Sequence, residues 1–301
     1  MKLGIIYAGQ GSQVVGMGKS FYPHEIFDQN EDLKELCFNG PLEKLSYTPY
    51  TQPCMVMVAT IITDLLKEHG IVPDYTAGLS LGEYSALYCA GVFKRQQVID
   101  LARFRGKVMQ EAVSEIESEM IAVLGMKEEL LQDLCHQASS LGVVSISNYN
   151  CPGQLVVAGE KKAVEKVKEL ALENKARRVI ALNTSGPFHT SLLKEASLAL
   201  KERFKKETFH EMKIPVIFNT LGHEIEYQSI PEILEKQVMS PVYFEKSIRY
   251  MIDQGVDTII EVGPGKVLSG FVRKIDRSIQ LSNRRYGVIE KNSESFEGRI
   301  K

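Results

Sequence analysis

The chain has 301 residues, of which 44% are apolar and 25% charged, and its formal net charge is −2. This composition is typical of a folded globular protein and excludes disordered, fibrous and strongly basic nucleic-acid-binding classes. The N-terminal residues do not have the pattern of a signal peptide, and no apolar run is long enough for a membrane span, so neither is expected. We therefore expect a cytoplasmic protein with no membrane or nucleic-acid partner. A monomer is also expected, although nothing in the composition decides the oligomeric state.

The cysteines are spread along the chain and form no Cys-x-x-Cys pair, at Cys37, Cys54, Cys89, Cys135 and Cys151. An odd number without paired spacing argues against a disulfide framework and against a zinc site. The sequence indicates neither a metal nor a cofactor.

The first part of the chain alternates between short apolar runs and helical patterns. Leu3 to Tyr7 predicts a buried strand, which a glycine turn follows. A helix is expected from Gln52-Pro53 to Gly70, because proline suits a first helical turn and glycine a helix end. A strand at Tyr75 to Leu79 and a helix at Glu83 to Ala90 come next. Strand, turn and helix in succession predict an α/β fold with a parallel sheet.

The middle of the chain predicts a different unit, whose β-α-β-β-α-β order is ferredoxin-like. Its expected elements are the strand Ile121–Gly125, the helix Lys127–Ser139, the strands Val143–Asn148 and Gln154–Ala158, the helix Glu160–Asn174 and the strand Arg178–Leu182. We predict a small subdomain at 117–186, inserted into a larger domain made of 1–116 and 187–282. Two further buried strands are expected in the larger domain, at Ile214–Asn219 and Thr258–Val262, and a polar tail at 283–301.

Gly78-Leu79-Ser80-Leu81-Gly82 is a G-x-S-x-G pentapeptide between a predicted strand and a predicted helix. In this motif a strained turn projects the serine hydroxyl, and the flanking glycines let the backbone segments approach closely. The following helix N-terminus favours negative charge near the hydroxyl. The pattern therefore makes Ser80 a candidate nucleophile.

A serine nucleophile needs a base, and His189 is the candidate. It lies in a loop after a predicted strand, whereas the other histidines lie in charged or helix-end contexts. Loops at strand ends commonly carry catalytic groups.

Several short motifs are weak alone, but their joint occurrence in this order is specific to one family of proteins. They are Gly9–Gln13, Thr51–Pro53, Gly78–Leu87, Arg105–Gln110, Asn148–Gln154, Gly186–His189 and Glu261–Leu268. Through them the chain resembles bacterial malonyl-CoA:acyl-carrier-protein transacylases from about residue 3 to about residue 275. The resemblance implies a hydrolase-like parallel α/β domain with an inserted ferredoxin-like subdomain, in agreement with the predicted elements.

The resemblance also implies a role for each matching position. Ser80 is expected to be the nucleophile and His189 its base, with the backbone amides of Gln10 and Leu81 as the oxyanion hole and Arg105 as the ligand of the malonyl carboxylate. A backbone carbonyl from Ser240 to Tyr243 is expected to orient the histidine. Asn150 is expected to lie near the pocket, but no role is assigned to it. From the residues alone, Arg105 is interpreted instead as a solvated helix residue.

The implied reaction transfers a malonyl group from malonyl-CoA to an acyl carrier protein through an acyl-serine, for fatty-acid or polyketide synthesis. Basic residues on the small subdomain, or Lys266 and Arg273, are candidates for docking an acidic carrier. The chain departs from the family at Leu79, where many relatives have histidine, and at Ser114–Met120, where a glycine-rich turn is usual.

Three alternatives stay open. A serine esterase or thioesterase fits the pentapeptide, although no His-Gly-Gly-Gly segment and no evident acidic triad member is present. A catalytically impaired paralogue that serves as a binding module would explain the altered loop at Ile116–Glu119. The third is the same transferase with a different acyl preference.

Overall fold

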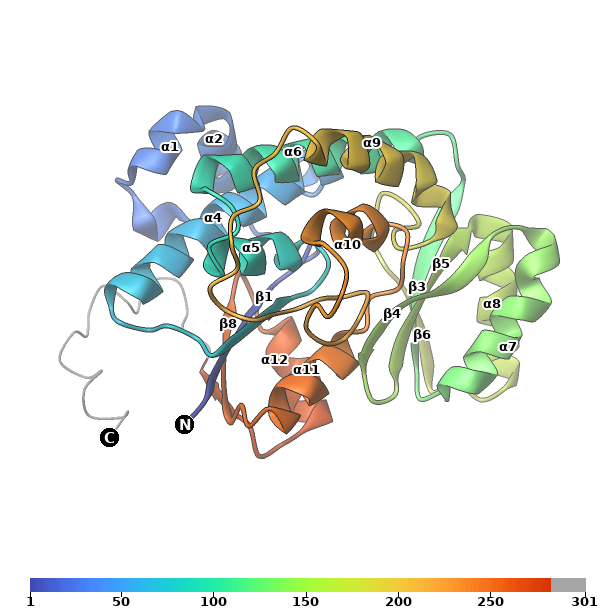
Figure 1. Cartoon of the computed structure of the whole chain (residues 1–301). Coiled ribbons are helices and arrows are strands. Elements are labelled where there is room, and N and C mark those ends of the chain that lie inside the picture. The colour runs from blue at the N-terminus through green and yellow to red at the C-terminus, as the bar shows by residue number, and fades with distance from the viewer. Residues whose placement is uncertain (283–301) are drawn as a thin grey trace.

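The computed structural model describes residues 1–282 and contains two separate sheets (Figure 1). The predicted polar tail at 283–301 lies outside the described residues. Within residues 1–282, no helix combines the length and the apolar character needed to cross a membrane.

The larger sheet is entirely parallel, in the order β7-β2-β1-β8-β9. Its strands are β1 (Leu3–Tyr7), β2 (Tyr75–Gly78), β7 (Val216–Ile217), β8 (Thr258–Val262) and β9 (Gln280–Ser282). Tyr7 pairs with Gly78 on one side and with Val262 on the other, so three strands end together. Loops that follow these strands therefore meet at one edge, where open α/β sheets bind their ligands.

Helices cover both faces of the larger sheet (Figure 1). Ile5 and Tyr7 belong to a core shared with α4 (Thr48–Glu68), α5 (Gly82–Cys89), α6 (Arg95–Ala112), α9 (Lys194–Phe204) and α10 (Ile230–Gln237). Ile6 points to the opposite face and belongs to a core shared with α11 (Phe244–Asp253) and α12 (Val267–Ile275). The near-continuous apolar run of β1 is what a strand buried on both faces requires.

The smaller sheet is antiparallel, in the order β4-β5-β3-β6. Its strands are β3 (Ser118–Leu124), β4 (Val144–Cys151), β5 (Gln154–Glu160) and β6 (Arg178–Ala181). The helices α7 (Glu128–Ala138) and α8 (Lys161–Glu173) pack on one face, over Ile121, Val123 and Val157. The alternate residues Met120, Ala122 and Val156 belong to the core of the larger domain. The predicted α/β fold class, with its ferredoxin-like insertion, is confirmed.

Tyr149 donates its backbone N–H to Val242 O at 2.8 Å, and Val242 returns one to Ser147 O at 2.9 Å. These bonds join β4 to the chain that precedes α11 and fix the smaller sheet beside the larger one.

Several predicted elements were wrong in extent. In the smaller sheet, β3 begins at Ser118 rather than Ile121, and β4 runs to Cys151 rather than Asn148. Two further differences lie in the larger domain. The helix expected to begin at Gln52-Pro53 is α4, which begins at Thr48 and carries Pro53 inside it. Pro49 already fills the first turn, and the buried apolar side chains of α4 outweigh the one helical bond that Pro53 cannot make. The strand expected at Ile214–Asn219 is only Val216–Ile217, because Phe218 N bonds to His223 O and the chain turns away.

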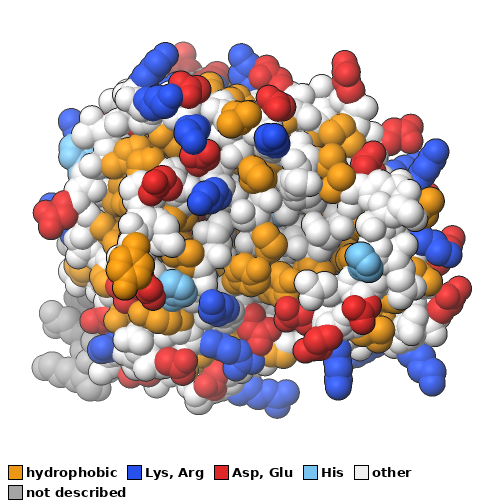
Figure 2. Space-filling model, turned by 45° about the vertical axis from the view of Figure 1, so that its right-hand side comes forward, with side chains coloured by type: hydrophobic (Ala, Val, Ile, Leu, Met, Phe, Trp, Pro, Cys, Tyr) orange, Lys and Arg blue, Asp and Glu red, His pale blue; other side chains and the backbone are white. Residues whose placement is uncertain are grey.

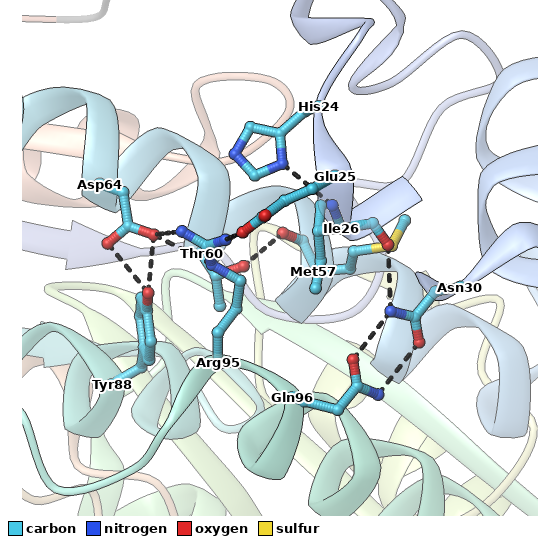
Figure 3. Close-up of polar contacts among 10 residues, drawn as sticks. All are labelled: His24, Glu25, Ile26, Asn30, Met57, Thr60, Asp64, Tyr88, Arg95 and Gln96. Atoms are coloured by element: carbon cyan, nitrogen blue, oxygen red, sulfur yellow. Dashed lines mark hydrogen bonds and ion pairs between the residues drawn. The ribbon is translucent and has the colours of Figure 1, made fainter. Parts of the chain in front are cut away.

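Among the remaining described helices, those from the N-terminal part of the sequence form a layer: η1 (Lys19–Phe21), α1 (Glu25–Gln29), α2 (Glu31–Asn39) and α3 (Leu42–Leu45). The short helices η2 (Ser139–Leu141) and η3 (Ser191–Leu193) lie elsewhere. Polar contacts tie this layer to the helices below (Figure 3). Arg95 bonds to Glu25 Oε1 at 3.1 Å and to the Asp64 carboxylate, which also accepts from Tyr88 Oη at 2.7 Å. Burial and the Asp64 carboxylate raise the pKa of Tyr88 to about 12. This network joins α1 to α4, α5 and α6, away from the sheet edge described above.

Candidate active site

Ser80 lies on a sharp turn between β2 and α5, with a left-handed φ of 53°. The turn works only with glycine on both sides. A Cβ on Gly78 would lie 1.9 Å from the Gly82 carbonyl carbon, and a Cβ on Gly82 would lie 2.2 Å from Tyr7 O. The pentapeptide therefore folds as a strained elbow that presents the serine hydroxyl at the sheet edge.

Ser80 Oγ lies 2.7 Å from His189 Nε2. The two residues are far apart in sequence, and the carboxyl end of β2 and the loop before η3 bring them together. His189 is buried and also has a left-handed φ, of 65°. Its backbone N–H donates to Val238 O at 3.0 Å, which pins the loop to the segment that follows α10.

The other ring nitrogen of His189 faces two backbone carbonyls, Gln237 O at 3.0 Å and Ser240 O at 3.1 Å. A carbonyl only accepts, so Nδ1 carries the hydrogen and Nε2 presents its lone pair to Ser80. Burial and, next, the charge of Arg105 lower the pKa of His189 to about 4. The imidazole is therefore neutral at neutral pH and able to accept the serine proton.

Arg105 projects from α6 into the same site and is 1% exposed. Its Nη2 donates to Ser80 Oγ at 3.2 Å and to Gln237 Oε1 at 3.1 Å, and its Nη1 donates to Gln52 Oε1 at 2.9 Å. The guanidinium lies over the Tyr84 ring, 5.4 Å from its centroid. The interpretation of Arg105 as a solvated helix residue is thus wrong.

The guanidinium of Arg105 contacts no carboxylate of the residues that the structure describes, and the charge of the buried Glu83 acts on it only at longer range. It forms no ion pair with a carboxylate there, and its Nε–H has no hydrogen-bond acceptor. Arginine stays charged in proteins, and a buried charge is costly unless it is paired. The site therefore places a buried cation beside the serine, which suits an anionic ligand.

Gln10 and Leu81 lie on either side of Ser80 at the ends of neighbouring strands. The turns touch: a Cβ on Gly9 would lie 2.5 Å from Leu79 O. Within residues 1–282, the backbone amides of Gln10 and Leu81 donate to no backbone or side-chain acceptor, and both residues line the cavity. Two amides without an acceptor in the cavity that holds Ser80 are what the expected oxyanion hole requires.

A cavity of about 280 Å³ opens over Ser80. Residues from both sheets line it: Gln10 and Leu81 on one side, Met120, Asn150 and Val156 from the smaller sheet, and Val267 and Phe271 from α12. Asn150 Oδ1 is buried without a hydrogen-bond partner among the described residues. The cavity is thus mostly apolar with a few polar groups, as small-molecule sites commonly are.

The two departures from the family lie differently with respect to this cavity. Leu79 lines it. Of the altered loop, only Met120 lines it, whereas Glu115 and Glu117 are exposed and Glu119 is half-buried away from the lining. The acidic loop therefore places no carboxylate in the cavity.

Sequence reasoning gave no role to three buried polar residues that surround Ser80: Glu83, Asn219 and Gln237. Ser80 N donates to Asn219 Oδ1 at 2.6 Å, and Gln237 Nε2 donates to Ser80 O at 3.0 Å. A signal was present, because Gln237 continues the apolar stripe of Ile233 and Leu234 on α10. A polar residue in an apolar helical stripe is either paired inside the core or functional.

The described residues contain no group of three or more His, Cys, Asp or Glu side chains that could hold a metal.

Comparison with known proteins places this geometry in a family. Residues 5–285 match the model of the acyl transferase domain. The chain is 42% identical over 291 residues to a malonyl CoA-acyl carrier protein transacylase of Bacillus subtilis, with 93% of this chain and 92% of the relative covered.

Solved structures agree. A malonyl CoA-acyl carrier protein transacylase from Clostridium perfringens superimposes with a TM-score of 0.90 at 41% identity, covering 94% of this chain and 93% of that one. A malonyl-transacylase in complex with a type II PKS acyl-carrier protein also gives 0.90, at 34% identity, covering 94% and 96%. This chain therefore belongs to the acyl transferase family, alongside the malonyl CoA-acyl carrier protein transacylases.

Proposed function

We propose that this enzyme transfers a malonyl group from malonyl-CoA to the phosphopantetheine thiol of an acyl carrier protein, in fatty-acid or polyketide synthesis. One observation carries the choice of acyl group: the unpaired, buried guanidinium of Arg105 lies 3.2 Å from Ser80 Oγ. A malonyl group carries its free carboxylate two bonds beyond the thioester carbonyl. The planar guanidinium binds that carboxylate while the carbonyl sits at the serine.

In the first half-reaction, Ser80 Oγ attacks the thioester carbonyl carbon as its proton moves to His189 Nε2. The carbonyl oxygen becomes an oxyanion, which the amides of Gln10 and Leu81 stabilise; one such donor is worth about 3 kcal/mol of barrier. Collapse of the intermediate breaks the C–S bond, and the proton on Nε2 passes to the departing coenzyme A sulfur. Malonyl-Ser80 remains, and Gln237 O and Ser240 O hold the ring throughout.

In the second half-reaction, the carrier thiol gives its proton to His189 and attacks the ester carbonyl. The Ser80 oxygen leaves and takes the proton back, which restores the free enzyme. Because the acyl group waits on the serine between the two steps, ping-pong kinetics are expected.

The test is the mass of the intact protein after incubation with malonyl-CoA and, separately, acetyl-CoA. A malonyl adduct that maps to Ser80, that is absent from Ser80→Ala, and that a pantetheine thiol removes faster than water does is the expected result. Removal by water at the same rate would point to an esterase or thioesterase. No adduct with either donor would point to an impaired paralogue.

The acid limb of the pH profile follows from the environment of His189. Burial and then the charge of Arg105 lower the pKa of His189 to about 4, and only the unprotonated ring accepts the serine proton. We expect kcat/KM for malonyl-CoA to be constant from neutral pH to about pH 5 and to halve near pH 4. Initial rates across this range, with circular dichroism as the control for folding, provide the check. A midpoint near 6.5 would mean that the base titrates like a solvent-exposed histidine.

The carrier is proposed to dock beside α12. Lys266 caps this helix and is exposed, and Arg273, Lys274 and Arg277 line a second, shallow hollow. Lys274 Nζ, from this hollow, bonds to Gln154 Oε1 at 3.1 Å, and Gln154 lines the active-site cavity. The α8 lysines instead lie on the face of the smaller sheet that points away from the cavity.

Charge reversal tests this docking surface. On the face seen in Figure 2, basic and acidic side chains are intermixed, so local charges rather than a single field should decide docking. Lys266→Glu with Arg273→Glu is expected to lower kcat/KM for the carrier about tenfold and to leave acylation by malonyl-CoA unchanged. Lys162→Glu with Lys168→Glu on α8 is the matched control and should change neither. Equal loss in both half-reactions would contradict the proposal.

We further propose that the protein acts as a monomer in the cytoplasm. We also propose that it consists of a larger domain, residues 1–116 and 187–282, and a smaller subdomain, residues 117–186. The five cysteines are buried free thiols, which suits a reducing compartment. Light scattering coupled to size-exclusion chromatography would test the monomer.

A further inference from the structure

Glu83 is a buried acid for which the mechanism above has no use. It lies in the first turn of α5, three residues after Ser80, and is 0% exposed. It forms no ion pair within residues 1–282. A carboxyl group at such depth is costly unless its hydrogen bonds are satisfied.

One oxygen of Glu83 binds Asn219, and Asn219 in turn stabilises the sharp turn at Ser80. Asn219 N donates to Glu83 Oε2 at 2.6 Å. The Asn219 side chain then clamps both ends of the turn, because Oδ1 accepts from Ser80 N at 2.6 Å and Nδ2 donates to Gly78 O at 2.6 Å.

The other oxygen of Glu83 leads to Arg105. Gln237 Nε2 donates to Glu83 Oε1 at 3.0 Å and to Ser80 O at 3.0 Å. The oxygen of the same carboxamide accepts from Arg105 Nη2 at 3.1 Å. Gln237 thus connects an acid, a backbone carbonyl and the guanidinium in one chain of hydrogen bonds.

This pattern fixes which way round the Gln237 amide sits. Its NH₂ faces two acceptors and its oxygen faces a donor, so the reverse orientation would set NH₂ against the guanidinium. Glu83 therefore receives a donor on each oxygen. Burial is the largest influence on the pKa of Glu83 and raises it to about 8, even though the Asn219 N–H, the charge of Arg105 and the Gln237 amide act in the opposite direction.

We propose that Glu83 is a positioning residue for the malonyl-binding guanidinium: through the Gln237 carboxamide it sets the place of Arg105, and through Asn219 it sets the elbow of Ser80. The inference rests on the proposed function, since it concerns how the same site selects a carboxylate. It predicts that a change of one atom at Glu83 alters the acyl preference and not only the stability.

Glu83→Gln is that change. A glutamine has one acceptor oxygen, and the fixed Asn219 N–H requires it. The new NH₂ then faces Gln237 Nε2, so the Gln237 amide must turn over and present its own NH₂ to Arg105. The guanidinium loses one of its three acceptors, Gln237 Oε1, and Ser80 O loses the Gln237 donor. His189 is affected less, because it is held by the backbone carbonyl of Gln237.

The experiment compares kcat/KM for Ser80 acylation by malonyl-CoA and acetyl-CoA, together with the Tm of each variant. Glu83→Gln is expected to reduce the malonyl-to-acetyl ratio about tenfold or more. The matched control is Glu261→Gln. Glu261 is also buried and also accepts two backbone N–H groups, from Leu268 at 3.1 Å and Ser269 at 2.8 Å, without a bond to Gln237 or Arg105. It should lower Tm and leave the ratio unchanged.

A second variant tests whether Glu83 acts on Arg105 through the Gln237 carboxamide, and it keeps the test possible if Glu83→Gln does not fold. Gln237→Met keeps the side-chain volume and the backbone carbonyl on His189 but removes the amide link, so it should lower the ratio by a similar factor. In the double variant the effects should not multiply, because both act through one link. An unchanged ratio in Glu83→Gln or Gln237→Met, or fully multiplicative effects, would overturn the inference. Failure of the proposed function would show separately, as a wild-type protein that forms no malonyl adduct.

Discussion

Replacing His189 by alanine is expected to slow the acylation of Ser80 by malonyl-CoA by about 10²- to 10⁴-fold. The reason is geometric: His189 Nε2, at 2.7 Å, is the one basic atom in contact with Ser80 Oγ among the described residues. Its neighbour Arg105 donates to the same oxygen and cannot accept a proton. Without the imidazole, the serine proton has only water to receive it.

Single-turnover formation of the malonyl-enzyme, followed by quenching and mass measurement, isolates this step from transfer to the carrier. His223→Ala is a suitable control, because His223 is half-buried beside Tyr250 and bonds to its neighbour's carbonyl. It should acylate at the wild-type rate. If His189→Ala retained most of its acylation rate with an unchanged Tm, another base would have to be sought.

The position of a site residue could be predicted from the sequence where it follows from a local pattern. The elbow of Ser80 needs only a strand, a helix and two glycines, and all of these lie within a few residues. Leu81 follows from the same turn. The position of Gln10 was harder, because it depends on β1 and β2 being neighbours, yet two βα units in a parallel sheet make that pairing the natural one.

For Arg105, the interpretation from charge and composition alone, a solvated helix residue, was wrong. Between Arg103 and Lys107 it reads as part of a solvated face, but side chains two apart on a helix point in different directions. Val98, Leu101, Ala102 and Met109 share its face of α6, and all are buried. The periodicity therefore contained the signal that this arginine enters the core.

Glu83, Asn219 and Gln237 could not be connected from sequence, because they meet only through tertiary contacts that span more than 130 residues. Their hydrogen bonds depend on where α10 lies against α5 and on the chain leaving β7 after two residues. Nor did the expected carbonyl segment, Ser240–Tyr243, include Gln237, whose carbonyl also holds His189. A long-range polar network has no period and no fixed spacing by which to find it.

Arg105→Met is expected to lower kcat/KM for malonyl-CoA by about 10²- to 10³-fold and to leave that for acetyl-CoA within a few-fold of wild type. Malonyl loses a charge-assisted, desolvated contact, whereas acetyl never made it. The charge of Arg105 also lowers the pKa of His189. A bound malonyl carboxylate offsets that charge and so strengthens the base, which an acetyl group cannot do.

Arg105→Lys separates charge from shape. Lysine keeps the cation but lacks the fork, so it should recover only part of the malonyl rate while still suppressing the basicity of His189. In Arg105→Met, by contrast, the acid midpoint of kcat/KM should move above its value of about 4, because one cause of the lowered pKa is gone. Acylation rates with both donors, measured from pH 4 to pH 8, give the preference and the midpoint together. A malonyl preference that survived in Arg105→Met would place the carboxylate elsewhere in the cavity, with Asn150 and Gln154 the next side chains to replace.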